Sequence, residues 1–287
     1  MEKGLKFTKW SSRFDKVKIL NLIKEGKNFK EISSILEIPT RRFGEMMKSN
    51  DMSFETRGYL IPKNNNFFES IDSEIKAYLL GYTLADGCVL IEPKRKKGVI
   101  YSYSKRLAFC VSIDDREVIN LLKDNISSVS NIREFHCSIG AINRKRQLSL
   151  KFASSKIVDD LIKLGINPNK TYESDFQFNF ENIDTSLIRH FIRGFFDGDG
   201  SYRVGTLSFI STSLPFLKQI EEYFKLEIPS ITSRIRSSKG KTIDYHQLHF
   251  NTGKGVEKEV YDLLYQNSNY YLQRKKVKFK VNSELTE

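Results

Sequence analysis

The chain has 287 residues, 39% of them hydrophobic, and its 47 lysines and arginines against 35 aspartates and glutamates give a net charge of +12. This length and apolar content suffice for two or three compact units with cores of their own. The basic charge favours a polyanionic partner, but it does not separate DNA, RNA and an anionic membrane. No apolar run predicts a transmembrane helix, and the first residues do not resemble a signal peptide, so we expect a soluble, intracellular protein with no membrane partner.

The cysteines exclude two further classes. Cys88, Cys110 and Cys137 are odd in number and lack CxxC spacing, so they predict neither a disulfide framework nor a zinc site. We expect reduced thiols packed in strands.

Residues 1–50 predict a small helical unit. Apolar residues at Val17, Ile19, Leu20 and Ile23 indicate an amphipathic helix that ends at Gly26, and a second helix follows over 29–36. A third helix begins at residues 39–40 and runs to about residue 48.

This succession of short helices resembles the helix-turn-helix module, with residues 40–48 as the recognition helix. The groove-facing candidates are Thr40, Arg41, Arg42 and Glu45, because Phe43 and Met47 fit the core side. An accessory three-helix cap without DNA contact is the alternative. Residues 51–70 lose periodicity and include the polar run 62–66, so we expect a linker there and a first lobe that begins near Ile71.

Two segments of the chain, 78–88 and 191–201, repeat one pattern of apolar residues, glycines and a final aspartate, and a repeat of this kind governs the organisation of the fold. Each has apolar residues at helical spacing and then a glycine, which predicts an apolar helix with a glycine stop. Small residues stand four apart in both, Gly81 with Ala85 and Gly194 with Gly198, so the two helices can pack with their backbones in contact.

Such packing would bring Asp86 and Asp199, the last residues of the two helices, side by side. A carboxylate at a helix C-terminus opposes the helix dipole at a cost of roughly 0.3–1 kcal/mol, and two neighbouring carboxylates repel each other. A divalent cation would resolve this conflict. Few oxygen ligands with room for water and phosphate suit Mg²⁺.

At these residues the sequence resembles the LAGLIDADG homing endonucleases, with both motif copies on one chain. The second copy, residues 192–200, keeps the glycines and both aspartates of the signature. In the first copy, residues 79–87, Leu84 stands where the family's first aspartate usually lies, which we interpret as a packing change. The resemblance implies Asp86 and Asp199 as catalytic metal ligands, with the Gly87 or Gly200 backbone as a further ligand, and Mg²⁺ as cofactor with Mn²⁺ as a substitute.

The first lobe, residues 71–170, predicts two hairpins and two helices after its motif. Residues 93–98 form the tip of the first hairpin, the second hairpin has a basic tip at 144–146, and helices cover 114–125 and 156–164. In the last strand Leu148, Leu150 and Phe152 share one face. A two-stranded ribbon fits the major groove. The predicted DNA contacts of this lobe are Lys94, Arg95, Lys96, Lys97, Tyr101, Tyr103, Lys105, Arg144, Lys145, Arg146, Gln147 and Lys151.

The second lobe, residues 187–287, repeats this order after a linker at 171–186, but its first hairpin is shorter, so we expect the two lobes to contact DNA unequally. Alternation places basic and polar side chains on one face of its strands, and Arg with guanine and Gln with adenine are natural major-groove pairs. Exposed or phosphate-contacting residues are the alternative reading. The candidates are Arg203, Thr232, Arg234, Arg236, Tyr245, Gln247 and His249.

The resemblance also implies a catalytic lysine beyond the last helix of each lobe. The matching positions are Lys170 and Lys275, the latter ambiguous with Arg274 and Lys276. Lys156 and Lys254 are a competing repeat pair, which we interpret as phosphate contacts or solvated lysines. The family's water-positioning polar residue would fall near Ile113 and Ser213, so the first lobe departs from that pattern.

We therefore expect an α+β fold with two pseudo-symmetric αββαββα lobes and saddle-shaped antiparallel sheets, preceded by a small all-α unit. The resemblance implies a monomeric, metal-dependent DNA endonuclease that hydrolyses both strands of a long, asymmetric double-stranded target and leaves short 3′ overhangs. Two alternatives remain open, an RNA maturase that assists intron splicing and a non-cleaving transcriptional regulator.

Overall fold

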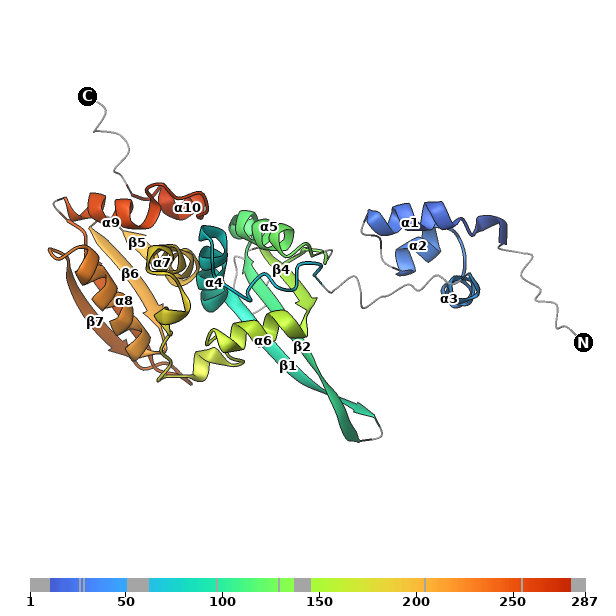
Figure 1. Cartoon of the computed structure of the whole chain (residues 1–287), viewed down its shortest axis with the longest axis horizontal. Coiled ribbons are helices and arrows are strands. Elements are labelled where there is room, and N and C mark those ends of the chain that lie inside the picture. The colour runs from blue at the N-terminus through green and yellow to red at the C-terminus, as the bar shows by residue number, and fades with distance from the viewer. Residues whose placement is uncertain are drawn as a thin grey trace, which may run out of the picture.

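The computed structural model describes residues 11–25, 27, 29–50, 62–96, 98–128, 130–136, 146–203, 205–253 and 255–279. After a 3-10 helix at Ser11–Arg13, three helices form the N-terminal unit: α1 (Lys16–Lys24), α2 (Phe29–Ile35) and α3 (Thr40–Ser49). They pack around a cluster of buried side chains separate from the main core (Figure 1). Among the described residues, no helix is both long and apolar enough to cross a membrane.

The packing of the N-terminal unit corrects one predicted stripe. Phe43 and Met47 are buried, as predicted, but Val17 and Leu20 are 68% and 49% exposed. The inner face of α1 instead follows Ile19, with Leu22 and Ile23 packed beside it. This is the i, i+3, i+4 spacing of a helix face, and the predicted stripe mixed two faces.

The first lobe contains α4 (Glu74–Asp86), β1 (Gly87–Lys96), β2 (Val99–Ser112), α5 (Arg116–Asn125), β3 (Arg133–His136), β4 (Arg146–Ala153) and α6 (Ser155–Lys163), with a 3-10 turn at Ile113–Asp115 before α5. Its antiparallel sheet has the order β1-β2-β4-β3. The predicted linker is too long at its C-terminal end, because Phe67 and Phe68 already lie in the core of the lobes.

The second lobe follows 3-10 turns at Lys170–Tyr172 and Phe180–Asn182. It contains α7 (Thr185–Asp199), β5 (Ser201–Arg203), β6 (Thr206–Ser211), α8 (Leu214–Glu227), β7 (Thr232–Ser238), β8 (Tyr245–Asn251), α9 (Val256–Tyr265) and α10 (Gln273–Lys276). Its sheet order, β5-β6-β8-β7, repeats that of the first lobe. Two lobes of one topology confirm the predicted α+β fold, and one continuous apolar core joins them.

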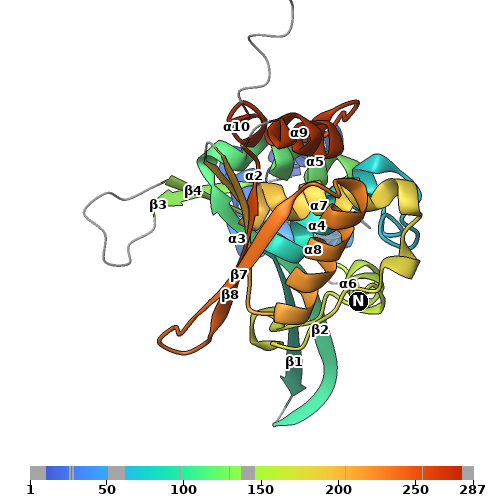
Figure 2. The ribbon, with the colours of Figure 1, turned by 90° about the vertical axis from the view of Figure 1, so that its left-hand side faces the viewer.

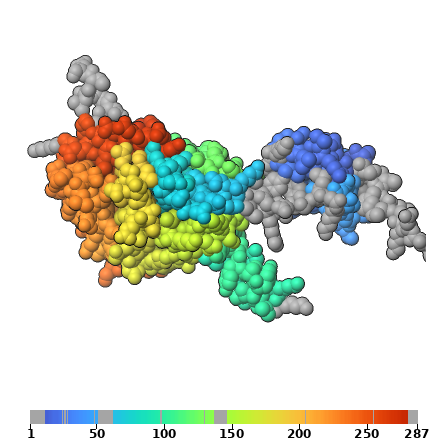
Figure 3. All heavy atoms as spheres, in the orientation of Figure 1, coloured from blue at the N-terminus to red at the C-terminus, as the bar shows by residue number. Residues whose placement is uncertain are grey.

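Both sheets keep one face on the helices and leave the other open. Leu148, Leu150 and Phe152 of β4 are buried, which confirms the predicted alternation. The hairpin β1–β2 projects beyond the helices (Figure 2) and forms a separate protrusion of the molecular surface (Figure 3). Strand β1 runs through Lys96, so three of the four cations predicted in the turn belong to the strand, with a register shift between Lys94 and Arg95.

The two described cysteines lie on strands, but they are not packed. Cys88 in β1 and Cys110 in β2 are exposed and form no disulfide, Cys110 Sγ donates to Gln147 Oε1 at 3.4 Å, and Cys137 lies outside the described residues. The prediction of buried thiols is wrong for the first two, because both alternate with core residues onto the open face of the sheet.

Candidate active site

The two motif helices, α4 and α7, pack side by side at the junction of the lobes (Figure 1). A Cβ atom added to Gly81 would lie 1.9 Å from the carbonyl oxygen of Phe191, and one added to Gly194 would lie 2.0 Å from that of Tyr78. A Cβ on Gly198 would stand 2.4 Å from the Ala85 methyl group. The small residues therefore permit backbone contact, as the repeat predicted.

Each motif helix stops at the glycine that follows its aspartate, as predicted, but the glycine is not needed there for a left-handed conformation. Gly87 and Gly200 are extended, with φ of −75° and −84°, and neither adopts the left-handed cap conformation. Their Cβ positions would lie 2.5 Å from the carbonyl oxygens of Thr83 and Phe196 respectively. Each helix thus passes directly into a strand at a point where a side chain does not fit.

Burial and neighbouring charges alter the pKa values of the two motif aspartates. The pKa of Asp86 is raised to about 6, first by burial and then by the charges of Asp199 and Asp115. The pKa of Asp199 is also raised by burial, against the opposing influence of Lys170 and Lys275. Both carboxylates stand at the C-terminal end of a helix, where backbone carbonyls point at them. A bound cation would relieve this concentration of negative charge.

The two predicted lysines each reach the end of one motif helix. Lys170 Nζ donates to the carbonyl oxygen of Ala85 at 2.7 Å and also to that of Leu84. Lys275 Nζ donates to the carbonyl oxygens of Gly200 and, at 3.3 Å, of Phe196. Each lysine therefore caps the carbonyls next to its lobe's aspartate. Burial lowers the pKa of both lysines to about 8.

The neighbours of Lys275 have other partners. Arg274 forms a two-point ion pair with Asp115 of the first lobe, with Nε–Oδ1 and Nη2–Oδ2 distances of 2.5 and 2.9 Å. Lys276 Nζ lies 3.8 Å from the centroid of the Tyr271 ring. The competing Lys156 pairs with Glu69 and Asp160, and Lys254 lies outside the described residues.

The donor set fits a weakly caged, hard cation. Among the described residues no three His, Cys, Asp or Glu side chains converge as metal ligands, so protein oxygens would fill only part of a coordination shell. Two carboxylates with space for water suit Mg²⁺, which retains several waters when bound to proteins. The Gly200 carbonyl oxygen accepts from Lys275, which disfavours it as the predicted backbone ligand.

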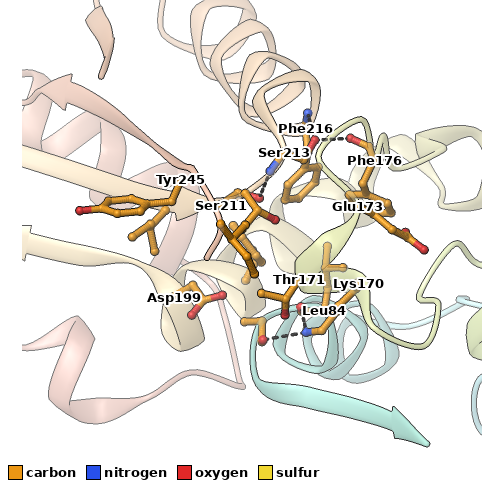
Figure 4. A pocket seen from close by; sticks show the side chains of 15 residues that line it. Leu84, Lys170, Thr171, Glu173, Phe176, Asp199, Ser211, Ser213, Phe216 and Tyr245 are labelled. Atoms are coloured by element: carbon orange, nitrogen blue, oxygen red, sulfur yellow. Dashed lines mark hydrogen bonds between the residues drawn. The ribbon is translucent and has the colours of Figure 1, made fainter. Parts of the chain in front are cut away.

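A cavity of about 380 Å³ opens beside Asp199 on the side of Lys170, with Ser211 and Tyr245 in its wall (Figure 4). Ser213, predicted near a water-positioning site, donates to the Phe176 carbonyl oxygen and accepts from a backbone N–H at the start of α8. That hydroxyl is therefore engaged structurally. Ser211, which the sequence did not single out, also lines the cavity, and its hydroxyl accepts from the Ser213 backbone N–H at 3.0 Å.

On the open face of the second sheet, the predicted DNA contacts lie in register. Arg234 pairs with His249 and Arg236 with Gln247 across β7 and β8. Opposite residues of an antiparallel pair share a face, so these side chains form one patch. Burial and the two arginines lower the pKa of His249, which is thus neutral at pH 7. The remaining candidates also lie on this face. Arg203 pairs with Thr206, which pairs with Asn251, and Asn251 in turn pairs with Thr232. Tyr245 lies at the end of β8.

The first sheet requires three corrections, because Tyr103, Lys105 and Arg146 lie on the face of the core residues and not on the open face. Tyr103 lies two residues before Lys105 on β2, and Arg146 lies two residues before the buried Leu148 on β4 and pairs with Glu134. Lys105 alternates onto the helix-covered face and pairs with Asp159 of α6. Arg106 of β2, which was not predicted, takes the open face. Its partner on β4 is Ala153, which lies two residues along that strand from Lys151. Lys94, Arg95, Lys96, Tyr101, Tyr103, Arg146, Gln147 and Lys151 belong to β1, β2 and β4, whereas Lys97, Arg144 and Lys145 lie outside the described residues.

The candidates of the N-terminal unit sit on the outer side of α3. Arg41 and Arg42 are exposed, and both pair with Glu45. Thr40 shares a hydrogen bond with Ser33. The helix-turn-helix interpretation of this unit stays a prediction.

Residues 186–268, most of the second lobe, match the family of LAGLIDADG-like domains, which confirms the resemblance found in the motif. Mesophilic variants of the homing endonuclease I-DmoI are similar in structure at 15% identity and a TM-score of 0.48, over 69% of this chain and 98% of that chain. I-DmoI in complex with DNA and Mn is similar at 13% identity and a TM-score of 0.47, over 69% of this chain and 98% of that chain. The I-LtrWI LAGLIDADG homing endonuclease bound to target DNA is similar at 12% identity and a TM-score of 0.41, over 65% of this chain and 80% of that chain. No curated protein matches the chain.

Proposed function

We propose that this chain is a site-specific, metal-dependent DNA endonuclease of the homing type. The observation that carries the proposal is the pairing of Asp86 and Asp199 at the ends of two packed helices, with Lys170 and Lys275 capping the same ends. A LAGLIDADG-like domain over residues 186–268 supports it independently.

The two carboxylates hold Mg²⁺, for which Mn²⁺ can substitute, and the cation supplies Lewis-acid activation of water and of the scissile phosphate. The protein's own part is to concentrate negative charge at one point and to place a lysine beside each carboxylate. With a pKa of about 8, each lysine is mostly protonated at pH 7. An ammonium group there stabilises the charge that develops on the phosphate during hydrolysis.

Double-stranded DNA lies against the open faces of the two sheets. Arg234, Arg236 and Gln247 read bases in the second lobe, and the β1–β2 hairpin extends the contact in the first. Because the lobes differ in hairpin length and in side chains, the target is long and asymmetric. One chain provides both lobes, so a monomer cuts both strands and leaves short 3′ overhangs.

The test is cleavage of a DNA pool that includes the sequence flanking the gene, with Mg²⁺ and then with Ca²⁺. We expect discrete double-strand breaks that require Mg²⁺ and disappear in Asp199→Asn, while DNA binding persists. The matched control is Asp175→Asn, an exposed aspartate in the connection between the lobes, which should cut normally.

Three outcomes would contradict the proposal. Specific DNA retention without any cutting would indicate a transcriptional regulator. Indifference to DNA with tight binding to a structured intron RNA would indicate a maturase. Loss of DNA binding in Asp199→Asn would exclude the assignment of that carboxylate as a metal ligand alone.

A further inference from the structure

The two motif helices differ at one position that the metal site does not use. Asp197 of α7 occupies the place that Leu84 occupies in α4. Both side chains are buried, and Asp197 is fully inaccessible. A buried carboxylate persists only with good hydrogen-bond donors, so its partners show what it holds in place.

Asp197 accepts three hydrogen bonds from three different parts of the chain. Its Oδ2 atom accepts from the Leu272 backbone N–H at 2.7 Å and from the Tyr78 hydroxyl at 2.9 Å. Its Oδ1 atom accepts from the Tyr265 hydroxyl at 2.9 Å. Asp197 therefore ties α7 to α4, to α9 and to the segment that follows α9.

That segment is the one that carries Lys275. Leu272 is the N-cap residue of α10, and its carbonyl oxygen accepts from the Lys275 N–H at 2.9 Å. The next residue, Gln273, donates its N–H to Glu117 at 2.9 Å. Arg274 pairs with Asp115, so each of the three residues before Lys275 is bound by a carboxylate outside the turn. These three contacts fix the direction of the Lys275 side chain.

The first lobe lacks this arrangement. The Leu84 side chain has no polar atom that could accept from a backbone N–H of the Lys170 turn, as Asp197 accepts from Leu272. That turn follows Asn169, whose φ is 60°, and closes on itself through a bond from the Glu173 N–H to the Lys170 carbonyl oxygen at 3.1 Å. The two lysines reach equivalent places by different supports.

We infer that Asp197 is a positioning residue for Lys275, so that the two strands of a DNA target depend on it unequally. The inference rests on the proposed nuclease function. Asp197 touches neither DNA nor metal. It acts by holding the Leu272 N–H, and loss of that hold displaces Lys275 from the end of α7 while Lys170 stays in place.

The experiment uses the full chain and a supercoiled plasmid that carries a site selected by wild-type cleavage, with the two strands labelled separately. Lys275→Met and Lys170→Met first show which strand each lysine serves. Asp197→Leu, which installs the residue of the first lobe, should slow the strand affected by Lys275→Met by about 10²-fold, the scale of a misplacement near 1 Å. The other strand should be cut near the wild-type rate, so nicked circles accumulate.

Two further variants keep the test decisive. Asp197→Asn can still accept from Leu272 through its amide oxygen, while its NH₂ donates to the Tyr265 hydroxyl oxygen, so it should restore cutting of both strands. If Asp197→Leu does not fold, Leu272→Pro removes the N–H at a residue whose φ of −82° lies near that of proline. It also removes a buried leucine side chain and turns the proline ring toward the Asp197 carboxylate, so the hold is lost and the same strand bias should result.

Equal slowing of both strands by Asp197→Leu or Leu272→Pro would overturn the inference and reduce Asp197 to a general stabiliser. Full activity of these variants would overturn it as well. Failure of the wild type to cut would instead refute the proposed function. A strand bias in Lys275→Met without one in the Asp197 and Leu272 variants refutes the inference alone.

Discussion

Gly81 of α4 lies so close to Phe191 of α7 that an added Cβ atom would stand 1.9 Å from the Phe191 carbonyl oxygen. That oxygen belongs to a packed helix, so the overlap can be relieved only by separating the two helices. We expect Gly81→Ala to lower the free energy of unfolding by about 3 kcal/mol or more, the upper end of overpacking effects. Urea denaturation followed by circular dichroism measures it.

Gly253→Ala is the control for Gly81→Ala, because its Cβ atom would meet nothing closer than an Asn251 side-chain oxygen at 3.4 Å. It should change stability only slightly. Equal stability of Gly81→Ala and the wild type would show that the helices are not in backbone contact.

When no metal is bound, the free energy of unfolding should depend on pH through the Asp86 carboxyl group. The Asp86 pKa is about 6 in the folded protein and near 3.9 when unfolded, so between these values the folded state binds more protons. The stabilisation is complete below about pH 4 and is lost as the pH rises through 6, at a cost of up to about 3 kcal/mol. We expect thermal unfolding in EDTA to give a lower Tm at pH 7.5 than at pH 5.

Mg²⁺ should reverse this loss, because a ligand that binds only the folded state raises the Tm. Asp86→Asn is the informative variant: it should be more stable than wild type in EDTA at pH 7.5, and it should respond less to Mg²⁺. A wild-type Tm that is indifferent to Mg²⁺ at millimolar concentration would argue against the metal site.

The sequence alone predicted what is periodic or repeated. The close contact of α4 with α7 follows from Gly81 and Gly194 in two copies of one motif, and the inward face of β4 follows from simple alternation. The support of Lys275 could not be predicted this way. Asp197 and Leu272 lie far apart in the chain, and no local pattern states which backbone N–H a buried carboxylate accepts.

The same reason explains the errors on the first sheet. In a ribbon as polar as residues 101–106, the hydrophobic pattern does not mark the inner face, so the sequence analysis chose Lys105 and not Arg106 as a DNA contact. The strand register and the Asp159 carboxylate on α6 decide between them. A register error of one residue exchanges the two faces of a strand.

The Arg274–Asp115 pair should couple the two lobes energetically. Asp115 is buried, so Arg274→Met leaves a carboxylate without its charged partner in a site of low polarity. A fully buried pair would cost about 3–5 kcal/mol on such a change. The Arg274 side chain is 36% exposed, so water screens part of the loss and we expect about 1–3 kcal/mol.

Chemical denaturation of Arg274→Met, Asp115→Asn and the double variant measures this coupling. The double variant should be more stable than the sum of the single changes predicts. Lys225→Met, which removes an exposed partner of Glu221 on α8, should have a smaller effect than Arg274→Met. Strict additivity at Arg274 and Asp115 would show that the pair carries no coupling.

The N-terminal unit is expected to add affinity without choosing the cut position. Arg41 and Arg42 project from α3 of a unit with its own core, whereas Asp86 and Asp199 belong to α4 and α7, which pack in the core of the two lobes. If both arginines bind phosphates, their replacement by alanine lowers DNA affinity and reduces the slope of log K against log salt by roughly 0.9 for each phosphate that is no longer neutralised. Filter binding across salt concentrations measures both quantities.

Arg13→Ala is the matched control for the Arg41 and Arg42 changes, because it also removes an exposed arginine and an ion pair, here with Glu37, away from α3. It should leave the salt slope unchanged. The Arg41 and Arg42 double variant should still cut the selected site at the same bonds, since the sheets that we propose to contact the target are intact. If its affinity and slope equal those of wild type, the unit is an accessory cap that does not contact DNA.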